Sequence, residues 1–291
     1  MLLSLCLALK PRGKDVRLLP PTLGKAAYAG FLELIGALDV DMAERLHSAR
    51  EKPFTLCLYR GDPGITPGES ASDPGPWLRI TSLDACLSRL LLEMASRPGG
   101  LGPLRLLGTE FEIVKVYNSQ GEHPWAGGSS FVELYNNWVA QTKERRLPED
   151  IWLEFCTPTA FAISGSEWDL PLPLPQLVFQ SLFNKWMAFS SIPLDLKVEE
   201  IGRYVGIKRY SLRTQMLQFG ERSKRQLGFV GECEFGVRRE AGRDFMQLIN
   251  LLADFAFYAG VGKKAAWGMG QVRRRGKAFL RRDNNPSIIH P

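Results

Sequence analysis

His47 is the residue of this chain whose type and neighbours best suit proton-transfer chemistry. It lies in a helix-like segment, residues 41–52, with Arg50 and Lys52 close by in sequence. A histidine titrates near neutral pH and can donate or accept a proton, while a nearby cation stabilises a developing negative charge. Of the other two histidines, His123 lies in a Gly- and Pro-rich connector and the third is the next-to-last residue. His47 is therefore our candidate catalyst, although a histidine at the edge of an amphipathic helix has the same sequence pattern.

Metal-free RNA cleavage is the reaction that these side chains fit. A general base removes the proton of a ribose 2′-OH, an acid protonates the leaving 5′ oxygen, and a cation stabilises the phosphorane. The sequence has no C-x-x-C motif and no Cys/His cluster, so it predicts neither a zinc site nor a disulfide framework, and we expect no metal and no cofactor. The five cysteines are expected to be small core residues in a reducing cytoplasm: Cys6, Cys57, Cys86, Cys156 and Cys233.

A second candidate site is the segment 260–270, in which two Gly-apolar-Gly triplets flank five residues that include Lys263, Lys264 and Trp267. Glycine allows positive φ and close backbone approach, the lysines suit an anion, and the indole offers a stacking face. The segment lacks the preceding strand of a dinucleotide fingerprint and the Ser or Thr that follows Gly-Lys in NTPase loops. The pattern predicts a basic loop that binds an anion, with a tight turn between a helix and a strand as the alternative.

The charge distribution points to a polyanionic partner. Residues 1–196 hold 18 Lys and Arg against 22 Asp and Glu, whereas residues 197–282 hold 19 against 8. The second part is therefore strongly basic, which favours nucleic acid as the partner over a merely solvated surface. Beside Arg50 and the lysines of the glycine segment, charge clustering proposes these residues for RNA binding: Arg203, Lys208, Arg209 and Arg213.

The first half predicts the elements that must position His47. Periodicity indicates strand, helix, strand, strand, helix and strand, and Asp41 and Glu44 are spaced as a capping box before His47. This βαββαβ order is that of the ferredoxin-like fold, a frequent RNA-binding scaffold that also hosts many other functions. The expected elements are residues 2–9, 26–38, 54–59, 77–81, 83–95 and 111–117.

The second half repeats the count of about two helices and four strands, without convincing self-similarity in sequence. A Gly- and Ser-rich break at 118–130 places the boundary between an N-terminal domain, residues 1–125, and a C-terminal domain, residues 126–291. The fold class is thus α+β, with tandem ferredoxin-like domains and a C-terminal glycine-rich loop. The expected elements are a bridging helix at 131–146, strands at 151–155, 197–204, 210–219 and 228–236, helices at 176–190 and 245–258, and a basic tail from 273.

The chain, at 291 residues, is long enough for two ordinary domains. No apolar run approaches the ~20 residues that a membrane-spanning helix needs. The apolar opening, residues 1–9, lacks a positive leading region, and Lys10-Pro11-Arg12 stands where a signal peptide has small residues. We therefore expect a buried strand there and a cytoplasmic protein without a membrane partner.

These residues together resemble a known family, the CRISPR precursor-RNA processing endoribonucleases of the repeat-associated mysterious protein (RAMP) superfamily. Its C-terminal signature is Gly-apolar-Gly, five residues with at least one Lys or Arg, and Gly-apolar-Gly, and residues 260–270 match it at every position. Residues 46–56, with His47 before a strand, are similar to the family's histidine segment. Further similarities lie at 157–161 and 228–231, so that the resemblance covers most of the chain.

The resemblance implies tandem ferredoxin-like domains and metal-independent cleavage within the CRISPR repeat, leaving a 2′,3′-cyclic phosphate and a 5′-hydroxyl. It also implies that His47 is the general acid or base, that Lys52 is an electrostatic helper, and that Tyr28 matches a position where some members place a catalytic tyrosine. The glycine loop is implied to be a structural and RNA-binding element through Gly260, Gly262, Lys263, Lys264, Gly268 and Gly270.

Three functions remain open at the level of sequence. The first is an endoribonuclease that acts on CRISPR transcripts, with repeat RNA as its partner. The second is a catalytically silent RAMP subunit that binds guide RNA in an interference complex, for which His47 would be unnecessary. The third is a generic RNA-binding protein with no CRISPR role. Other subunits of an interference complex and a second copy of this chain are further candidate partners.

Overall fold

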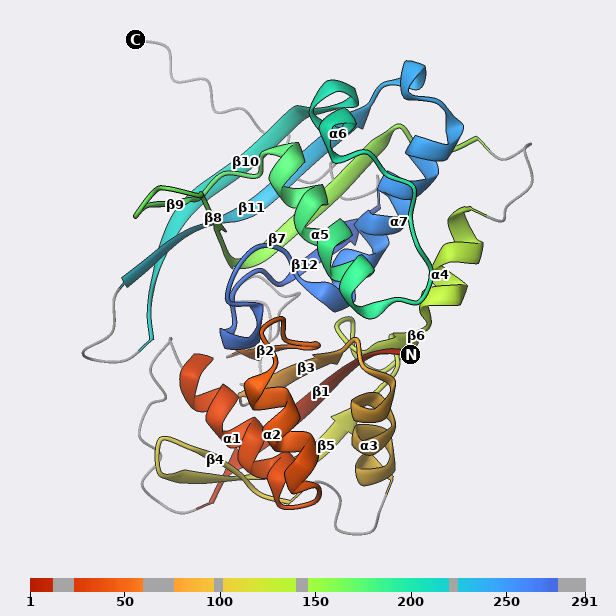
Figure 1. Ribbon diagram of the computed structural model, residues 1–291. Helices are drawn as coiled ribbons and strands as arrows, with labels where there is room; N and C mark the ends of the chain where they lie inside the picture. The colour runs from red at the N-terminus through yellow and green to blue at the C-terminus, as the bar shows by residue number, and fades with distance from the viewer. Residues whose placement is uncertain (13–23, 60–75, 97–101, 140–145, 220–224, 277–291) are drawn as a thin grey trace.

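Two lobes, each a sheet covered by helices, lie one above the other in the computed structural model of this protein (Figure 1). The structure describes residues 1–12, 24–59, 76–96, 102–139, 146–219 and 225–276. In the part of the chain so described, none of the helices combines the length and apolar character that crossing a bilayer requires.

The N-terminal lobe is an antiparallel sheet in the order β2-β3-β1-β5-β4, with three helices on one face (Figure 1). Strand β1 lies at its centre between β3 and β5, as expected for a ferredoxin-like unit. The elements are β1 Leu2–Pro11, α1 Gly24–Gly36, α2 Val40–Ser48, β2 Phe54–Tyr59, β3 Trp77–Ser82, α3 Ala85–Ala95, β4 Leu104–Leu106 and β5 Thr109–Tyr117.

The C-terminal lobe repeats this arrangement with the order β10-β11-β7-β12. Its first strand again lies between the third and the last, which confirms the tandem ferredoxin-like fold. The elements are β7 Asp150–Thr159, α5 Pro175–Phe189, α6 Val198–Tyr204, β10 Val205–Gln218, β11 Arg225–Val237, α7 Arg243–Ala259 and β12 Val272–Arg275, with a small hairpin of β8 Phe161–Ala162 and β9 Asp169–Leu170.

Two short elements connect the lobes, β6 Gly127–Ser129 and α4 Phe131–Trp138. Strand β6 pairs with β1 of the N-terminal sheet, and α4 packs against α7 of the other lobe. The proposed domain boundary between residues 125 and 126 falls directly before β6 and stays a prediction. The chain passes from one lobe to the other within these two elements.

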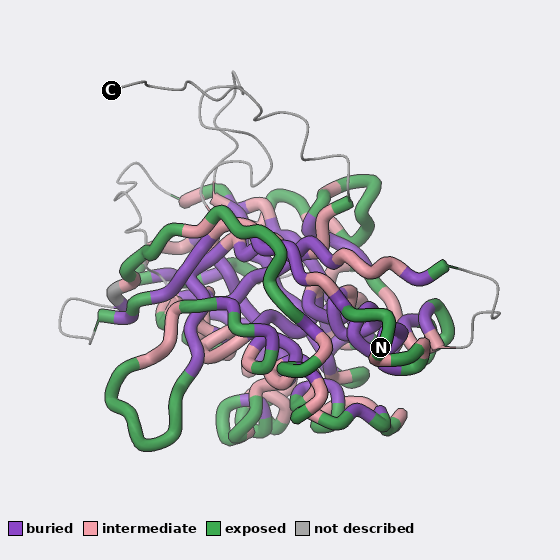
Figure 2. The backbone as a smooth tube through the Cα atoms, turned by 90° about the horizontal axis from the view of Figure 1, so that it is seen from above, coloured by how far each residue is buried: buried purple, intermediate pink, exposed green. Residues whose placement is uncertain are grey.

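Burial explains why β1 and α7 are nearly continuous apolar sequences. Residues 2–7 of β1 are all buried, because helices cover one face of the sheet and the connector around Trp125 covers the other. Helix α7 is buried on almost every side, since it lies between its own sheet, α4, α5 and the N-terminal lobe. Figure 2 shows the buried residues gathered in the interior, with exposed segments around them.

Arg79 on β3 joins the two lobes and is only 1% exposed. In its own lobe the guanidinium donates to the Ser4 hydroxyl at 3.0 Å and the Trp125 carbonyl at 3.3 Å. Toward the other lobe it donates to the Phe257 carbonyl at 2.6 Å and to Oε1 of Gln271 at 2.8 Å. Its central carbon also lies 4.5 Å and 4.4 Å from the Trp125 and Phe257 rings. These contacts fix one relative position of the lobes.

Four local predictions need correction or limits. One is that Cys86, expected as a small core residue, is exposed on α3. The strand expected at 197–204 is wrong, because Val198–Tyr204 forms helix α6 with Glu199 and Glu200 in its first turn, where carboxylates favour a helix start. The capping box is also wrong, since Asp39 is the N-cap of α2 and accepts from the Met42 amide at 2.8 Å. The bridging helix expected at 131–146 ends at Trp138, and residues 140–145 lie outside the described part.

Candidate active site

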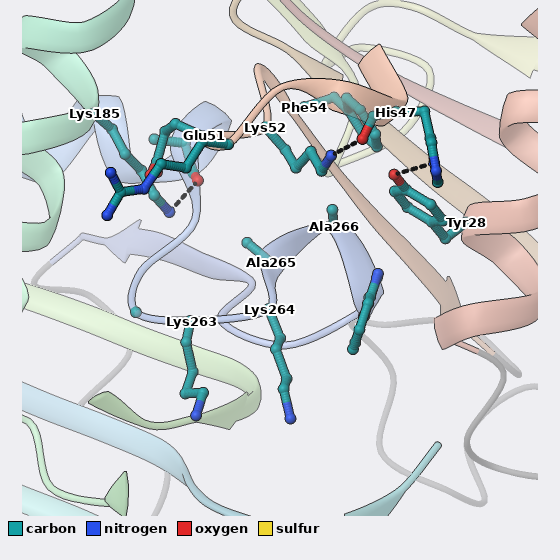
Figure 3. A pocket seen from close by; sticks show the side chains of 14 residues that line it. Tyr28, His47, Glu51, Lys52, Phe54, Lys185, Lys263, Lys264, Ala265 and Ala266 are labelled. Atoms are coloured by element: carbon teal, nitrogen blue, oxygen red, sulfur yellow. Dashed lines mark hydrogen bonds between the residues drawn. The ribbon is translucent and has the colours of Figure 1, made fainter. Parts of the chain in front are cut away.

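A cavity of about 500 Å³ lies where α1 and the end of α2 meet the glycine segment of the other lobe (Figure 3). Both lobes therefore contribute side chains to one site, although the glycine segment lies more than 200 residues after Lys52 in sequence. The lining residues are Tyr28, His47, Arg50, Glu51, Lys52, Phe54, Lys185, Ala259, Gly262, Lys263, Lys264, Ala265, Ala266 and Trp267.

His47 lies in the last turn of α2, is exposed, and points toward Tyr28 of α1 (Figure 3). The Tyr28 hydroxyl is 3.4 Å from Nδ1 of His47, which leaves Nε2 for another partner. The Tyr28 ring stacks on Phe54 with its centroid 6.0 Å away, so its position is fixed by the core. Burial raises the pKa of Tyr28, so the phenol stays protonated at neutral pH.

Lys52 follows α2 in the sequence, and its side chain lies beside the last turn of that helix. Its ammonium donates to the carbonyls of His47 at 2.6 Å and Leu46 at 3.1 Å, and lies 5.8 Å from the centre of the Tyr28 ring. A cation at the C-terminal end of a helix is favourable, because the last carbonyls lack partners within the helix. Desolvation lowers the pKa of Lys52. The lysine thus holds the turn that carries His47 and places a positive charge beside it.

The glycine segment forms the opposite wall, and all four of its signature glycines have positive φ. A Cβ on Gly262 would lie 2.5 Å from the Ala160 carbonyl oxygen, and one on Gly270 would lie 2.0 Å from that of Val261. The Val261 amide bonds the Gly270 carbonyl at 2.8 Å, which closes the loop on itself. The glycines therefore give the loop its shape, and RNA binding by their backbone stays a prediction.

Lys263 and Lys264 point away from His47, whereas Ala265 and Ala266 face Lys52 and Tyr28 (Figure 3). The Lys263 ammonium pairs with Asp169 of β9 at 2.7 Å, and that of Lys264 donates to Oε1 of Gln226 on β11 at 2.7 Å. Both lysines thus tie the loop to hairpins of the C-terminal lobe, and their contact with phosphates stays a prediction.

The four basic residues chosen from charge clustering lie outside this cavity. Arg203 is in the last turn of α6, with its guanidinium 5.1 Å from the Tyr204 ring. Along β10, Lys208 pairs with Asp150 at 2.5 Å, Arg209 pairs with Glu234 at 2.7 Å, and Arg213 is exposed. Arg50 alone of the predicted arginines lines the cavity. RNA binding by the other four stays a prediction.

Sequence reasoning missed Lys185 and Glu51, which also line the cavity. The buried Lys185 ammonium of α5 donates to the Ala259 carbonyl at 2.9 Å and to the Gly260 carbonyl at 3.0 Å. Burial lowers its pKa to about 8, and the negative charge of Glu51 acts in the opposite direction. The available signal was that Lys185 is the single charged residue of the helical segment 176–190. Within the described ranges, His, Cys, Asp and Glu side chains form no group of three or more that could hold a metal ion.

Comparison with known proteins gives one consistent family. Residues 153–272 match the family model described as CRISPR-associated endoribonuclease Cas6. A protein of that name from Mycobacterium tuberculosis strain H37Rv is 37% identical over 126 residues, which are 42% of this chain and 37% of the relative's length. One from Streptococcus thermophilus is 22% identical over 84% of this chain and 89% of its own. The chain thus aligns with well under half of the Mycobacterium relative.

Solved structures extend the likeness to nearly the whole chain. A Cas6 product complex is similar with a TM-score of 0.73 and 28% identity, covering 94% of this chain and 99% of the other. A Thermus thermophilus Cas6 gives a TM-score of 0.69 and 27% identity, with 94% and 98% covered. A structure described as an RAMP protein binding different RNA substrates shares the fold at 16% identity and a TM-score of 0.57.

Proposed function

We propose that this chain, a CRISPR-associated Cas6-type protein with the RAMP fold, is an endoribonuclease that cuts CRISPR precursor transcripts within the repeat without a metal ion. The observation that carries the proposal is the convergence of Tyr28, His47 and Lys52 on one cavity whose opposite wall is the glycine segment. The family match and the Cas6 product complex among similar structures support repeat RNA as the substrate.

His47 exchanges protons with the RNA through Nε2, because Nδ1 faces Tyr28. A phenol hydroxyl can donate or accept a hydrogen bond, so Tyr28 can hold the imidazole in either tautomer. As a base, Nε2 takes the proton of the 2′-OH, whose oxygen attacks the adjacent phosphorus. As an acid, it protonates the 5′ oxygen when the P–O bond breaks. The products then carry a 2′,3′-cyclic phosphate and a 5′-hydroxyl.

Lys52 supplies the electrostatic contribution. Two of the three ammonium donors bond backbone carbonyls, and the third is left to meet a phosphate oxygen in the cavity. A positive charge fixed beside the phosphorane stabilises it without reorganisation during the reaction. Because the same ammonium holds the end of α2, Lys52 also positions His47.

The test is cleavage of a labelled repeat RNA in excess EDTA, by the wild-type protein and by His47→Ala. We expect one discrete cut by the wild type and at least a ~100-fold loss in the variant, the contribution of a general acid or base, with RNA affinity changed only a few-fold. Cleavage that persists in His47→Ala, or that requires a divalent ion, would contradict the proposal. Tight binding without a cut by either protein would instead favour the silent guide-RNA subunit.

A further inference from the structure

Trp267 is the aromatic side chain of the glycine segment, and it lines the cavity that holds His47. It closes a short 3-10 turn, Ala265–Trp267, and its indole is half-buried. The ring meets Tyr28 edge-on at 6.4 Å and Phe219 edge-on at 5.7 Å between centroids. No aromatic ring of the described residues stacks parallel on this indole, although the neighbours hold its edges in place.

Two ammonium groups lie over this ring. Lys25 of α1 is 5.4 Å and Lys264 is 5.8 Å from the ring centre. Lys263 is neutralised by Asp169, but Lys264 bonds only the neutral amide of Gln226, and Lys25 has no carboxylate within ion-pair distance in the described part of the chain. Desolvation, together with repulsion from Lys263 and Lys25, lowers the pKa of Lys264. A flat aromatic ring with two such cations suits a ligand with a planar base and an anionic phosphate.

The backbone under Trp267 is fixed by direct contact with α1. A Cβ on Gly24 would lie 1.9 Å from the Trp267 carbonyl oxygen, so only glycine lets the helix start at this place. On either side of the turn, Lys264 and Gly268 adopt left-handed conformations with φ of 58° and 92°. The indole is therefore held in position before any ligand arrives, which reduces the entropy lost on binding.

The spacing to His47 defines what this platform can reach. The Tyr28 ring lies 6.2 Å from the His47 ring and 6.4 Å from the Trp267 ring, so one aromatic side chain separates the two. A strand whose phosphate is bound beside His47 can therefore reach Trp267 with a neighbouring nucleotide. A base inside a duplex has both faces stacked on its neighbours and cannot take up this position.

We propose that Trp267 stacks on the base of an unpaired nucleotide next to the scissile phosphate, and that Lys25 and Lys264 bind that nucleotide's phosphate. The inference rests on the proposed function and adds a single-stranded requirement to it. The Lys25 and Lys264 ammonium groups, which lie over the ring in this structure, move to the phosphate when the base arrives. Stacking of this kind tolerates any base, so the site selects unpaired RNA rather than a sequence.

The test combines variants of the protein with abasic RNA. After the wild-type cleavage position is mapped, repeat RNAs are made with one base removed at each position around it, and kcat/KM is measured for wild type, Trp267→Ala and Trp267→Phe. Trp168→Ala is the matched control, because this indole is 84% exposed on the β8–β9 hairpin and outside the cavity. Thermal unfolding of each variant confirms that it folds.

At one position next to the cut, removal of the base is expected to lower wild-type kcat/KM about ten- to a hundredfold. The same removal should have little effect in Trp267→Ala, an intermediate effect in Trp267→Phe, and the full effect in Trp168→Ala. The proposal that Trp267 stacks on a base would be overturned by either of two results. In the first, Trp267→Ala and removal of the base lower kcat/KM independently at every position; in the second, Trp168→Ala abolishes the effect of base removal as Trp267→Ala does. If the wild type binds repeat RNA but does not cut it, the same variants and abasic RNAs are compared by Kd instead. An effect of base removal on Kd that disappears in Trp267→Ala would then support stacking by Trp267, while the proposed activity fails.

Discussion

At the scale of residues, Lys185 shows how a side chain without a direct chemical role shapes this site. Its ammonium is buried and donates to the carbonyls of Ala259 and Gly260 at the end of α7. These carbonyls belong to the point where the helix ends and the glycine segment begins. The lysine therefore fixes the start of the loop opposite His47 at the cost of desolvating a charge.

This cost predicts a pH dependence of stability. The pKa of Lys185 falls from 10.5 to about 8 because of burial, so between these values the unfolded chain binds more protons than the folded one. Stability contributed by this site must then rise with pH through this window, by on the order of 3 kcal/mol. The free energy of unfolding is measured in urea for wild type and Lys185→Met at pH 7 and at pH 10. Relative to the variant, the wild type should be more stable at pH 10 than at pH 7. A difference that is the same at both pH values would contradict this account.

The sequence predicted the proximity of site residues where these residues are close neighbours in the chain. His47 lies in the last turn of α2 and Lys52 follows shortly after the end of that helix, so their proximity follows from spacing alone. Lys185 meets its carbonyl partners 74 and 75 residues away, and Lys263 finds Asp169 94 residues away. Local sequence patterns do not predict contacts between residues so far apart. The directions in which the Lys263 and Lys264 side chains point depend on such contacts, so they could not be predicted either.

Among the elements, the glycine segment was located correctly from the sequence, but the sequence did not show why its glycines are needed. Positive φ at Gly260, Gly262, Gly268 and Gly270 shows why these residues are glycines. At all of them except Gly268, a carbonyl oxygen would also lie within 3.0 Å of an added Cβ. The pattern could equally indicate close approach of a phosphate, and only the packing distinguishes the two. Helix α6 is an element whose type the sequence pattern predicted wrongly. Its mixed apolar and charged segment was expected to be a strand, but the two glutamates in its first turn favour the start of a helix.

We predict that Gly270→Ala disrupts this element. A Cβ there would lie 2.0 Å from the Val261 carbonyl oxygen at a φ of 66°, so the loop must open, at a cost of at least ~2 kcal/mol. Cleavage should fall with it, because Ala265, Ala266 and Trp267 would move from the cavity wall. Chemical denaturation and kcat/KM measure both effects.

Gly206→Ala provides the matched control for this prediction. Gly206 lies in β10, and a Cβ there would meet nothing within 4 Å. Its stability should stay within ~0.5 kcal/mol of wild type, as for an ordinary surface substitution. Equal losses for Gly270→Ala and Gly206→Ala would show that the loop's conformation is not what requires glycine.

At the scale of the whole molecule, the site exists only because two lobes hold one relative position. The N-terminal lobe supplies Tyr28, His47 and Lys52, and the C-terminal lobe supplies Lys185 and the glycine segment. The ferredoxin-like order of the N-terminal lobe was predictable from periodicity, since it is built from local elements. For the C-terminal lobe periodicity predicted only about the right count of helices and strands, and it took α6 for a strand. The docking of the lobes was not, because it depends on a buried arginine between two aromatic rings.

Replacement of that arginine, Arg79→Met, should loosen the docking. It leaves the Phe257 carbonyl and Gln271 without their donor in a buried place, which costs ~3 kcal/mol or more. Thermal unfolding should shift to lower temperature and kcat/KM should fall, while the exposed Arg89→Met on α3 changes neither. Arg79→Met with the stability and activity of Arg89→Met would mean that the lobes dock without it.

The central claim is that the RNA's own 2′-OH attacks the phosphorus while His47 carries the proton. The most direct measurement is cleavage of a repeat RNA with a single 2′-deoxynucleotide on the 5′ side of the mapped scissile phosphate, in EDTA. We expect this RNA to bind as tightly as the unmodified one and not to be cut. A cut at the same phosphate of the deoxy-substituted RNA would contradict the central claim, because the nucleophile would then have to be water.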